Sequence, residues 1–538
     1  MICCNLTISI AQTTVGLRKH TAGSNDNGYV LFAPMSDTTT YLIDKCGYVV
    51  HKWSDNYFPS LSVYLLPNGK LLKTGVDKTS PFNKGGGGGF IEIIDWDGNV
   101  EWTYKLSTTT ECQHHDVKYL PNGNILAIVY DKKTLEEVQN AGRDPQLFKN
   151  EFWSEKIKEL RPIGKDSAEI VWEWKIWDHL VQDFDSTKEN YGKVELHPEL
   201  VDANFGTANQ KVDWHHINSI DYNPKLDQIL LSSRHFHEIW IIDHSTTTLE
   251  AAAHKGGKYG KGGDLLYRWG NPIAYRHGTA EDEQLFYQHD AYWIKEGLPY
   301  AGNIMVFNNL RGPNNAKYSS VDIIKQPVNS EGFYDSELPY APATNEWSYT
   351  APNQNDFLAM NLSSAQMLEN GNVLICNGPR GFFFEIDSSK NTVWEYMNPV
   401  VMGGIVLQGL SPQLTNLVFR CTFYPDNFSG LLGKDLKRIG TVENINSLSE
   451  TCTLFTFVEE NTEEIKTNLY PNPSENIVNI KCEKDEYSVK VYNMQGRLVI
   501  SGGNINYINT SDLANGIYML NISYMSGNYS SKQFIVNR

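Results

Sequence analysis

The sequence predicts an all-β protein, a six-bladed β-propeller followed by a small C-terminal β-sandwich. Three observations lead to this fold class. Aromatic residues make up 12% of the 538-residue chain, which also holds 29 Tyr and 42 Gly, a composition that favours strands and tight turns. A short template recurs along most of the chain, and the composition changes after residue 440. A chain of this length also exceeds one ordinary domain.

The repeated template predicts the propeller. Each copy reads as an apolar strand, a turn of Asn-Gly type and a second apolar strand, followed by an Ile-Asp strand and a Val-x-Trp strand. Complete or partial copies lie at 30–53, 64–102, 119–172, 220–269, 302–347 and 367–394. Each copy forms a small antiparallel sheet that cannot bury both faces alone, and six such sheets packed radially bury them. A series of β-sandwiches is the alternative, but it would not explain repeats of one template.

The propeller is expected over 28–440, and the rest of the chain differs in composition. Residues 441–466 are rich in Glu, Asn and Thr and are expected to form a linker. Residues 467–538 alternate apolar and polar side chains, as the strands of a β-sandwich do. Residues 1–20 resemble a truncated signal peptide, mildly apolar but without a basic start. No apolar run approaches the ~18–20 residues of a membrane-spanning helix, so no transmembrane segment is expected.

Charge and cysteine content exclude several classes of function. Lys and Arg number 46 against 63 Asp and Glu, and the resulting charge of -17 disfavours nucleic-acid binding. An anionic ligand therefore needs a local cationic pocket. The 8 Cys form no CxxC pair, so neither a disulfide framework nor a structural metal site is expected.

Two glycine-rich stretches lack the spacing of a phosphate-binding loop. The run of five glycines at 85–89 is not followed by Lys-Ser/Thr and is expected to be a flexible hairpin tip. The Gly/Lys-rich stretch 255–263 is expected to be either a mobile basic loop near the channel or a linker between strands.

Three histidines occupy similar places in three successive copies of the repeat. His115 precedes the turn proline Pro121 by six residues, His216 precedes Tyr222 by the same distance, and His289 opens the corresponding strand. The first strand of a propeller blade lines the channel, so the three imidazoles are expected to converge on the axis. Side chains alternate along a strand, so His114 and His215 are expected to point the other way and to be structural.

Further polar residues are expected near the same place. Arg234 ends the second strand of the third copy, where the template does not demand an arginine. Asn218 lies two positions after His216 and is expected to share its strand face. Arg380 and Arg420 lie near the expected channel mouth and are further candidates for substrate binding, although a structural role suits both.

This set of residues leaves two chemistries open. Three neutral imidazoles can bind a transition metal. Imidazoles beside a guanidinium can instead hold a tetrahedral oxyanion, with one imidazole acting as a nucleophile. Arg234 favours the anion, because a fixed cation beside a metal ion raises the electrostatic cost. No Asp or Glu has the in-phase spacing that many metal sites use. Asp116 and Asp290 are expected on the opposite strand face from their neighbouring histidines, so neither can orient its neighbour.

The assembled motifs resemble the bacterial arylsulfate sulfotransferase family over about residues 28–440. The motifs on which this resemblance rests are 113–116 (QHHD), 213–220 (DWHHINSI), 231–234 (LSSR), 263–272 (GDLLYRWGNP), 288–291 (QHDA) and 361–366 (NLSSAQ). The resemblance implies a six-bladed propeller that moves a sulfuryl group from a phenolic sulfate ester, its small-molecule donor, to a phenolic acceptor. It implies a sulfohistidine intermediate, ping-pong kinetics and no cofactor, because the nucleotide donor PAPS is not used.

The same resemblance implies roles for individual residues. His289 matches the nucleophile, while His115, His216 and Arg234 match the groups that hold the sulfate oxygens. Asn218 matches a supporting polar residue, and no metal is implied. Some family members carry an additional N-terminal β-domain that helps them to dimerise, so the oligomeric state of this chain stays open.

The C-terminal block resembles the sorting domain of proteins exported by the type IX (Por) secretion system. The motifs are 468–473 (NLYPNP), 491–499 (VYNMQGRLV) and 513–518 (LANGIY). This resemblance implies the type IX secretion machinery as a partner, passage across the outer membrane, and a secreted or cell-surface location.

Two other functions compete with sulfuryl transfer. One is a metal-dependent extracellular enzyme that uses the same three histidines. The other is a secreted propeller that binds sulfated ligands without catalysis.

Overall fold

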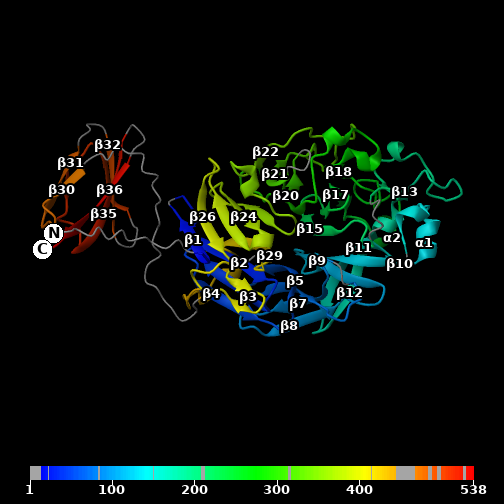
Figure 1. The fold of residues 1–538 in the computed structure, drawn as a ribbon, viewed down its shortest axis with the longest axis horizontal. Helices are drawn as coiled ribbons and strands as arrows, with labels where there is room; N and C mark the ends of the chain where they lie inside the picture. Colours follow the sequence, from blue (N-terminus) through cyan, green and yellow to red (C-terminus); the bar gives the residue numbers. More distant parts are fainter. Residues whose placement is uncertain are drawn as a thin grey trace, which may run out of the picture. The chain divides into compact units, whose positions relative to one another are not determined.

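The computed structural model contains two compact units, Met1–Thr456 and Phe457–Arg538. The described residues are 14–21, 23–82, 85–149, 151–206, 212–312, 317–412, 415–443, 467–482, 487–493, 498–524 and 529–538. The N-terminal signal-peptide prediction falls largely on 1–13 and the linker prediction on 444–466, and both segments lie outside the described residues. In Figure 1 the first unit runs from blue to yellow and the second from orange to red.

The described residues of the first unit form six antiparallel sheets of four or five strands, as expected for an all-β protein. The first three consist of strands from the N-terminal half of the chain, apart from β29, which comes from its C-terminal part. One sheet contains β29 (Val418–Pro425), β2 (Gly28–Pro34), β3 (Thr39–Asp44) and β4 (Val49–Ser54). The next contains β5 (Pro59–Leu65), β6 (Leu71–Val76), β7 (Gly89–Ile94) and β8 (Val100–Lys105). The third contains β9 (Glu111–Tyr119), β10 (Ile125–Lys133), β11 (Phe152–Ile163) and β12 (Ser167–Lys175).

The other three sheets follow in chain order. The fourth contains β15 (Ile217–Asn223), β16 (Gln228–Ser233), β17 (Glu238–Asp243) and β18 (Tyr267–Trp269). The fifth contains β19 (His289–Trp293), β20 (Ile304–Arg311), β21 (Tyr318–Ile324) and β22 (Trp347–Tyr349). The sixth contains β23 (Ser364–Met367), β24 (Val373–Asn377), β25 (Phe382–Ile386), β26 (Thr392–Met397) and β1 (Gly16–His20). Each copy of the sequence repeat falls on one sheet.

The first strands of these sheets contact one another in a regular order. Strand β5 contacts β9, β9 contacts β15, β15 contacts β19, and β19 contacts β23. Strand β23 contacts β29, which in turn contacts β5. Apolar residues that are fully buried, among them Leu42, Leu72, Val129, Ile241, Phe307 and Trp394, fill the space between neighbouring sheets.

The connections around the third and fourth sheets carry the extra secondary structure. Helix α1 (Leu135–Asn140) joins β10 to β11, and α2 (Thr248–Ala251) follows β17. The parallel pair β13 (Leu180–Val181) and β14 (Val201–Asp202) lies between β12 and β15. A second small pair, β27 (Val400–Val401) and β28 (Gly404–Ile405), follows β26. The short 3-10 helices are 145–147, 176–178, 194–196, 272–275, 280–282, 354–356, 378–380 and 429–431.

The second unit has its own core. One sheet contains β30 (Thr467–Tyr470), β31 (Ile477–Cys482) and β34 (Tyr507–Asn509), and the other β33 (Leu498–Gly503), β32 (Tyr487–Asn493), β35 (Gly516–Tyr524) and β36 (Tyr529–Val536). Val478, Val491 and Leu520 from both sheets are fully buried in one apolar cluster. Among the described residues of both units, no helix is long and apolar enough to cross a membrane.

Two findings differ from the sequence-based expectations for the first unit. Cys46 is disulfide-bonded, although the spacing of the cysteines predicted no disulfide framework, while Cys112, Cys376 and Cys421 are buried free thiols. The N-terminal segment 16–20 pairs as β1 with β26, so the sixth sheet begins before the expected start of the propeller at residue 28.

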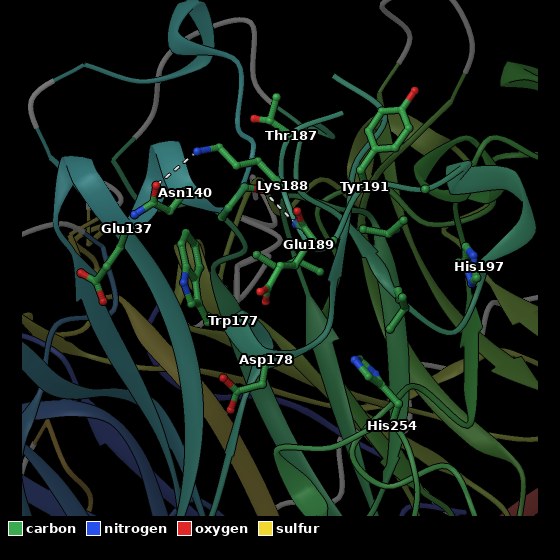
Figure 2. A pocket seen from close by; sticks show the side chains of 16 residues that line it. Glu137, Asn140, Trp177, Asp178, Thr187, Lys188, Glu189, Tyr191, His197 and His254 are labelled. Atoms are coloured by element: carbon green, nitrogen blue, oxygen red, sulfur yellow. Dashed lines mark hydrogen bonds between the residues drawn. The ribbon is translucent and has the colours of Figure 1, made fainter. Parts of the chain in front are cut away.

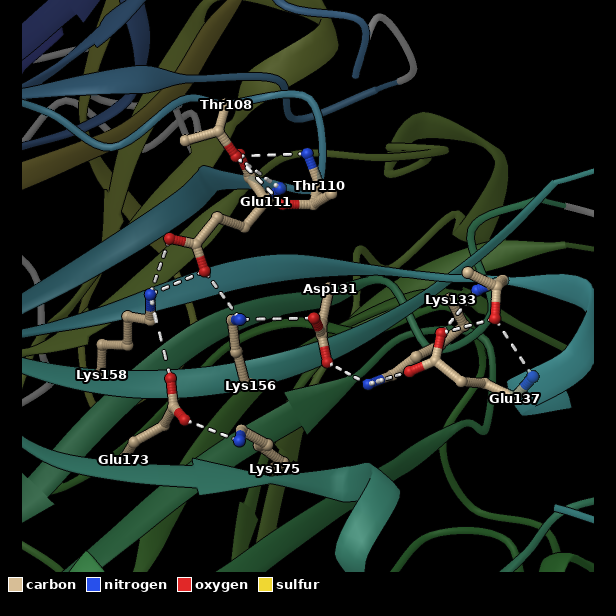
Figure 3. A network of polar contacts seen from close by, with 11 residues as sticks. Thr108, Thr110, Glu111, Asp131, Lys133, Glu137, Lys156, Lys158, Glu173 and Lys175 are labelled. Atoms are coloured by element: carbon tan, nitrogen blue, oxygen red, sulfur yellow. Dashed lines mark hydrogen bonds and ion pairs between the residues drawn. The ribbon is translucent and has the colours of Figure 1, made fainter. Parts of the chain in front are cut away.

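A network of ion pairs crosses the third sheet (Figure 3). Glu111 of β9 contacts Lys156 and Lys158 of β11, at 2.7 and 2.6 Å. Lys156 also contacts Asp131 at 3.3 Å, and Lys158 contacts Glu173 at 3.8 Å. Cross-strand pairs of opposite charge of this kind stabilise a sheet.

We expect Glu111→Gln to destabilise the protein in a pH-dependent manner. Burial opposes the ionisation of Glu111, but the hydrogen bonds from Lys156 and Lys158 outweigh it and lower the pKa. The carboxylate therefore stabilises the fold above the unfolded-state pKa of about 4.3, and this contribution is lost as the pH falls through the lower folded-state pKa. With partial screening by water, the loss at pH 7 is about 1 kcal/mol.

Urea unfolding of both proteins at pH 7 and below about pH 4 checks this expectation. The difference in the free energy of unfolding between wild type and Glu111→Gln should be smaller at the lower pH. An equal difference at both pH values would show that the ion pairs of Glu111 contribute nothing.

Candidate active site

Three histidines from neighbouring first strands come together through irregularities in those strands. The pairing registers of β9, β15 and β19 with their partners each shift beside the histidines. His115 and His216 have φ angles of 51° and 54°, and Asp290 has 56°. Such bulges interrupt the alternation of side chains and redirect them locally.

The histidine rings lie close together and beside one phenylalanine. The ring centroids of His115 and His216 are 4.4 Å apart. The ring of Phe419 on β29 lies 6.3 Å from that of His115 and 6.5 Å from that of His289. His115 and His289 are both 2% exposed. The structure thus brings together the three histidines that the sequence singled out.

Arg234 supplies a positive charge beside these rings. It follows β16, and its backbone N–H donates to the carbonyl oxygen of His216 at 3.3 Å. Its guanidinium lies 4.7 Å from the ring centroid of Tyr287, and no described residue accepts a hydrogen bond from it. Burial lowers the pKa of Arg234, as is expected of a cation without a carboxylate partner.

His289 is held in one tautomer by its neighbours. Its Nδ1 lies 3.1 Å from the carbonyl oxygen of Tyr287 and 2.8 Å from Oδ1 of Asn309. A carbonyl oxygen only accepts, so Nδ1 carries the proton and Nε2 keeps its lone pair. Burial, followed by the charge of Arg234, holds the pKa of His289 well below its usual range, so the ring is neutral.

Asn309 is itself fixed by two hydrogen bonds. Its Nδ2 donates to the carbonyl oxygens of Ala359 at 2.9 Å and Leu362 at 3.1 Å. This orients Oδ1 toward His289, and exchanging the two amide atoms would break three contacts. Asn309 is therefore a positioning residue, which the sequence analysis missed because β20 presents it from the neighbouring strand.

His115 is oriented by His114. Their Nδ1 atoms are 2.8 Å apart, and His114 stacks on Tyr130 with the ring centroids 3.5 Å apart. Burial lowers the pKa of His114 to about 3 and that of His115 well below its usual range, so both rings are neutral. Nε2 of His114 is buried without a partner in the described structure. A proton on Nδ1 of His114 avoids an unpaired N–H at its buried Nε2 and places the proton of His115 on Nε2.

The expectation that His114 points away from His115 is therefore wrong. The positive φ of His115 breaks the strand alternation on which that expectation rested. His215 does lie in the sheet core, with Nδ1 2.8 Å from Glu155 and its ring stacked 4.9 Å from Phe236.

His216 has an acidic partner that the sequence analysis did not find. Its Nδ1 hydrogen-bonds Oδ2 of Asp213, which also accepts from Tyr130 at 3.0 Å. Burial opposes the ionisation of Asp213, but the charge and hydrogen bond of His216 lower the pKa of its carboxyl group. The argument from spacing, which found no Asp or Glu in phase with these histidines for a metal site, did not identify Asp213. Asp213 precedes β15, where strand alternation gives no guide.

The glycine run 85–89 packs against the histidines instead of forming a flexible hairpin tip. A Cβ atom on Gly86 would lie 1.8 Å from Cε1 of His115, and one on Gly85 would lie 3.6 Å from Cε1 of His216. The backbone N–H of His115 donates to the carbonyl oxygen of Gly86 at 3.0 Å. Glycine is required here because the backbone approaches the imidazole directly.

Arg420 lies beside the histidines, but its guanidinium is paired with two carboxylates. Its guanidinium contacts Asp116 at 2.7 Å and Asp290 at 2.9 Å, and donates to the hydroxyl of Tyr64 at 2.7 Å and to the carbonyl oxygen of Asn218 at 3.1 Å. These contacts join five first strands. Arg420 therefore ties the sheets together, in keeping with a structural role.

The two remaining predicted residues, Asn218 and Arg380, lie in different surroundings. Asn218 is fully buried, and its Nδ2 donates to the carbonyl oxygen of Gln288 at 2.7 Å. Its Oδ1 has no partner in the described structure. Arg380 ends the 3-10 helix 378–380 and is exposed, with no contact to the histidines among the described residues.

Two family models match the chain. Residues 18–402 match the model described as Arylsulfotransferase (ASST), and 468–537 match the one described as Secretion system C-terminal sorting domain. The second match indicates export, with secretion or attachment at the cell surface. No curated protein matches the chain.

Several solved structures are similar at low identity. A protein of unknown function from Bacteroides caccae is 12% identical with a TM-score of 0.38, covering 74% of this chain and 98% of that one. A catalytically inactive virginiamycin B lyase from Staphylococcus aureus, solved with quinupristin, is 9% identical with a TM-score of 0.33, covering 72% and 90%.

We expect His289 to be neutral and protonated on Nδ1 between about pH 5 and about pH 8, because burial disfavours its charged form. Nitrogen NMR of protein with labelled histidines checks this, with the His289→Gln spectrum providing the assignment. Titration of His289 near pH 6.5 would contradict its neutral state. A proton on Nε2 would contradict the assigned tautomer.

Proposed function

The chain belongs to the arylsulfotransferase family, and we propose that it transfers a sulfuryl group from a phenolic sulfate ester to a phenolic acceptor through a sulfohistidine on His289. The observation that supports this proposal most directly is that His289 presents an unprotonated Nε2 in the same cluster as the unpaired guanidinium of Arg234. A nucleophile needs the lone pair, and the anionic donor needs the cation.

In the proposed first half-reaction, Nε2 of His289 attacks sulfur. An S–N bond forms, the S–O ester bond breaks, and the phenolate leaves with the bonding electron pair. Arg234 and the Nε2–H of His115 donate to the sulfuryl oxygens, where charge develops. Asn309 accepts the Nδ1 proton of His289 in a hydrogen bond and stabilises the ring as it becomes positively charged.

His216 is the proposed proton donor to the leaving phenolate. Asp213 holds its Nδ1 proton, so the ring can carry a second proton on Nε2 as an imidazolium paired with the carboxylate. After the phenol departs, neutral His216 accepts the proton of the acceptor phenol as that oxygen attacks sulfur. The S–N bond breaks, and the starting protonation states return. Asp213 acts through His216 and is a positioning residue.

The six sheets are the proposed blades of a propeller with the histidines at its axis. The order of contacts supports this arrangement, because each first strand touches the next and β23 and β29 lead back to β5. The C-terminal unit is the proposed signal for the type IX secretion machinery, which its sorting-domain match supports. The proposed donors and acceptors are accordingly phenolic compounds outside the cell.

Metal-dependent catalysis at the three histidines fits the site less well. Arg234 would lie beside the metal ion without a carboxylate partner, which raises the electrostatic cost. Sulfuryl transfer by the proposed route is insensitive to chelators. A protein that binds sulfated ligands without catalysis would show binding and no turnover.

We expect His289→Gln to abolish transfer from p-nitrophenyl sulfate to phenol while leaving the fold intact. Wild-type protein should give parallel double-reciprocal lines when donor and acceptor are varied, because the first product leaves before the acceptor binds. His197→Gln, at a partly exposed histidine of the same unit, is the control and should keep wild-type turnover. Wild-type turnover in His289→Gln would exclude the proposed nucleophile.

The two arginines near the histidines should respond differently to substitution. Arg234→Met should lower kcat by ~10²–10³ with little change in stability, because it removes a donor to the developing charge. Arg420→Met should lower the free energy of unfolding by about 3–5 kcal/mol, because it leaves Asp116 and Asp290 as unpaired buried carboxylates. Turnover assays and urea unfolding of both variants provide the measurement. An equal loss of unfolding free energy in Arg234→Met and Arg420→Met would contradict the different roles proposed for the two arginines.

A further inference from the structure

A second group of histidines lies in the connections around α2, outside the proposed active site. His179, His254 and Asp264 form this group, called here the His179 cluster. Oδ1 of Asp264 lies 2.8 Å from Nδ1 of His179 and 2.8 Å from Nδ1 of His254. The three potential ligand atoms all lie within 4.8 Å of one another. No described contact joins these residues to His289.

Hydrogen bonding leaves a metal-binding lone pair on His179. Its Nε2 lies 2.8 Å from the carbonyl oxygen of Ala251, which only accepts, so Nε2 carries the proton. A neutral His179 then presents the lone pair of Nδ1 to the carboxylate of Asp264. Two acceptors at 2.8 Å repel each other unless a proton or a cation lies between them.

A metal ion can occupy this place between the two ligand atoms. Ligating histidines characteristically donate their other N–H to a backbone carbonyl, as His179 does to Ala251. Tetrahedral zinc with bonds of about 2.0–2.2 Å separates neighbouring ligand atoms by roughly 3.3 Å. Only small movements of the rings from the observed 2.8 Å are needed. Two imidazole nitrogens and one carboxylate oxygen suit zinc better than magnesium or calcium, which prefer oxygen ligands.

The loop that ends at Gly263 packs closely against His179. A Cβ on Gly263 would lie 2.0 Å from the carbonyl oxygen of Ala251 and 2.5 Å from Nε2 of His179. The indole N–H of Trp174 donates to the carbonyl oxygen of Gly263 at 2.7 Å, and its ring stacks on His179. The stretch 255–263 is therefore packed at its end against this cluster and is not a loop at the histidines of the candidate active site.

One side of the cluster faces a pocket. The pocket has a volume of about 730 Å³, and His254 lies on its wall together with Asp178, Tyr191 and His197 (Figure 2). The side chain of His254 is 58% exposed, whereas that of His179 is fully buried and that of Asp264 is 7% exposed. A fourth ligand, water or a small molecule, can therefore approach from the pocket.

We propose that His179, His254 and Asp264 bind one zinc ion at the edge of this pocket. The ion joins the loop after α2 to the segment after β12 and keeps one coordination position open to the pocket. This site is independent of sulfuryl transfer, whose proposed residues lie elsewhere.

Zinc binding to the purified full-length chain tests this proposal. The protein is stripped with a chelator, dialysed against zinc chloride and analysed for bound metal and thermal unfolding. Wild type should retain one zinc ion per chain and unfold at a higher temperature with zinc. His254→Ala removes an exposed ligand and should weaken zinc affinity by more than about 100-fold, since even loss of an outer-shell partner costs 10–100-fold. Asp264→Asn should weaken it as well.

His197→Ala is the matched control, because His197 lines the same pocket and contacts Glu199 instead of the cluster. It should bind zinc as wild type does. Absence of stoichiometric zinc in wild type would overturn the proposal. Zinc retained by His254→Ala but lost from His216→Ala would place the metal among the other histidines and would overturn it too. Sulfuryl transfer should be unchanged in His254→Ala, so the two proposals can fail separately.

Discussion

The hydrogen bonds of His289 Nδ1 determine what this site can do. Because Tyr287 and Asn309 both accept from Nδ1, the lone pair remains on Nε2. Burial and Arg234 keep the ring neutral, which preserves that lone pair at physiological pH. The same principle of one fixed nitrogen and one free nitrogen recurs in the neighbouring rings. His114 hydrogen-bonds Nδ1 of His115, and Asp213 hydrogen-bonds Nδ1 of His216, which leaves Nε2 of each ring away from these partners.

The positive charge of the site comes from one arginine, although the protein as a whole is acidic. The protein carries a net charge of -17, so an anionic aryl sulfate gains little from the molecule as a whole. Arg420 and Arg234 both lie near the histidines, but Asp116 and Asp290 neutralise Arg420, whereas no described residue accepts a hydrogen bond from the guanidinium of Arg234. Arg420 thus holds the sheets together, and Arg234 is the arginine proposed to bind the anion. This division explains how an acidic protein can present a cationic site.

The sequence predicted the broad organisation because its signals are periodic. The Asn-Gly template marked the six sheets, and the phase of His115, His216 and His289 predicted that their rings meet. Prediction failed where periodicity ends. The bulge at His115 places His114 beside it, contrary to strand alternation, and Asp213 acts from a turn before β15. Asn309 and Gly86 act across strands, and no spacing along the chain reveals a contact between two different strands.

The most direct test of the central claim is the covalent state of the enzyme after exposure to an aryl sulfate without acceptor. Intact mass spectrometry should show a gain of about 80 Da, as a covalent sulfuryl intermediate requires, and fragmentation should place it on His289. Adding phenol should remove it. An unmodified chain that nevertheless turns over the donor, or a sulfuryl group on another residue, would contradict the account.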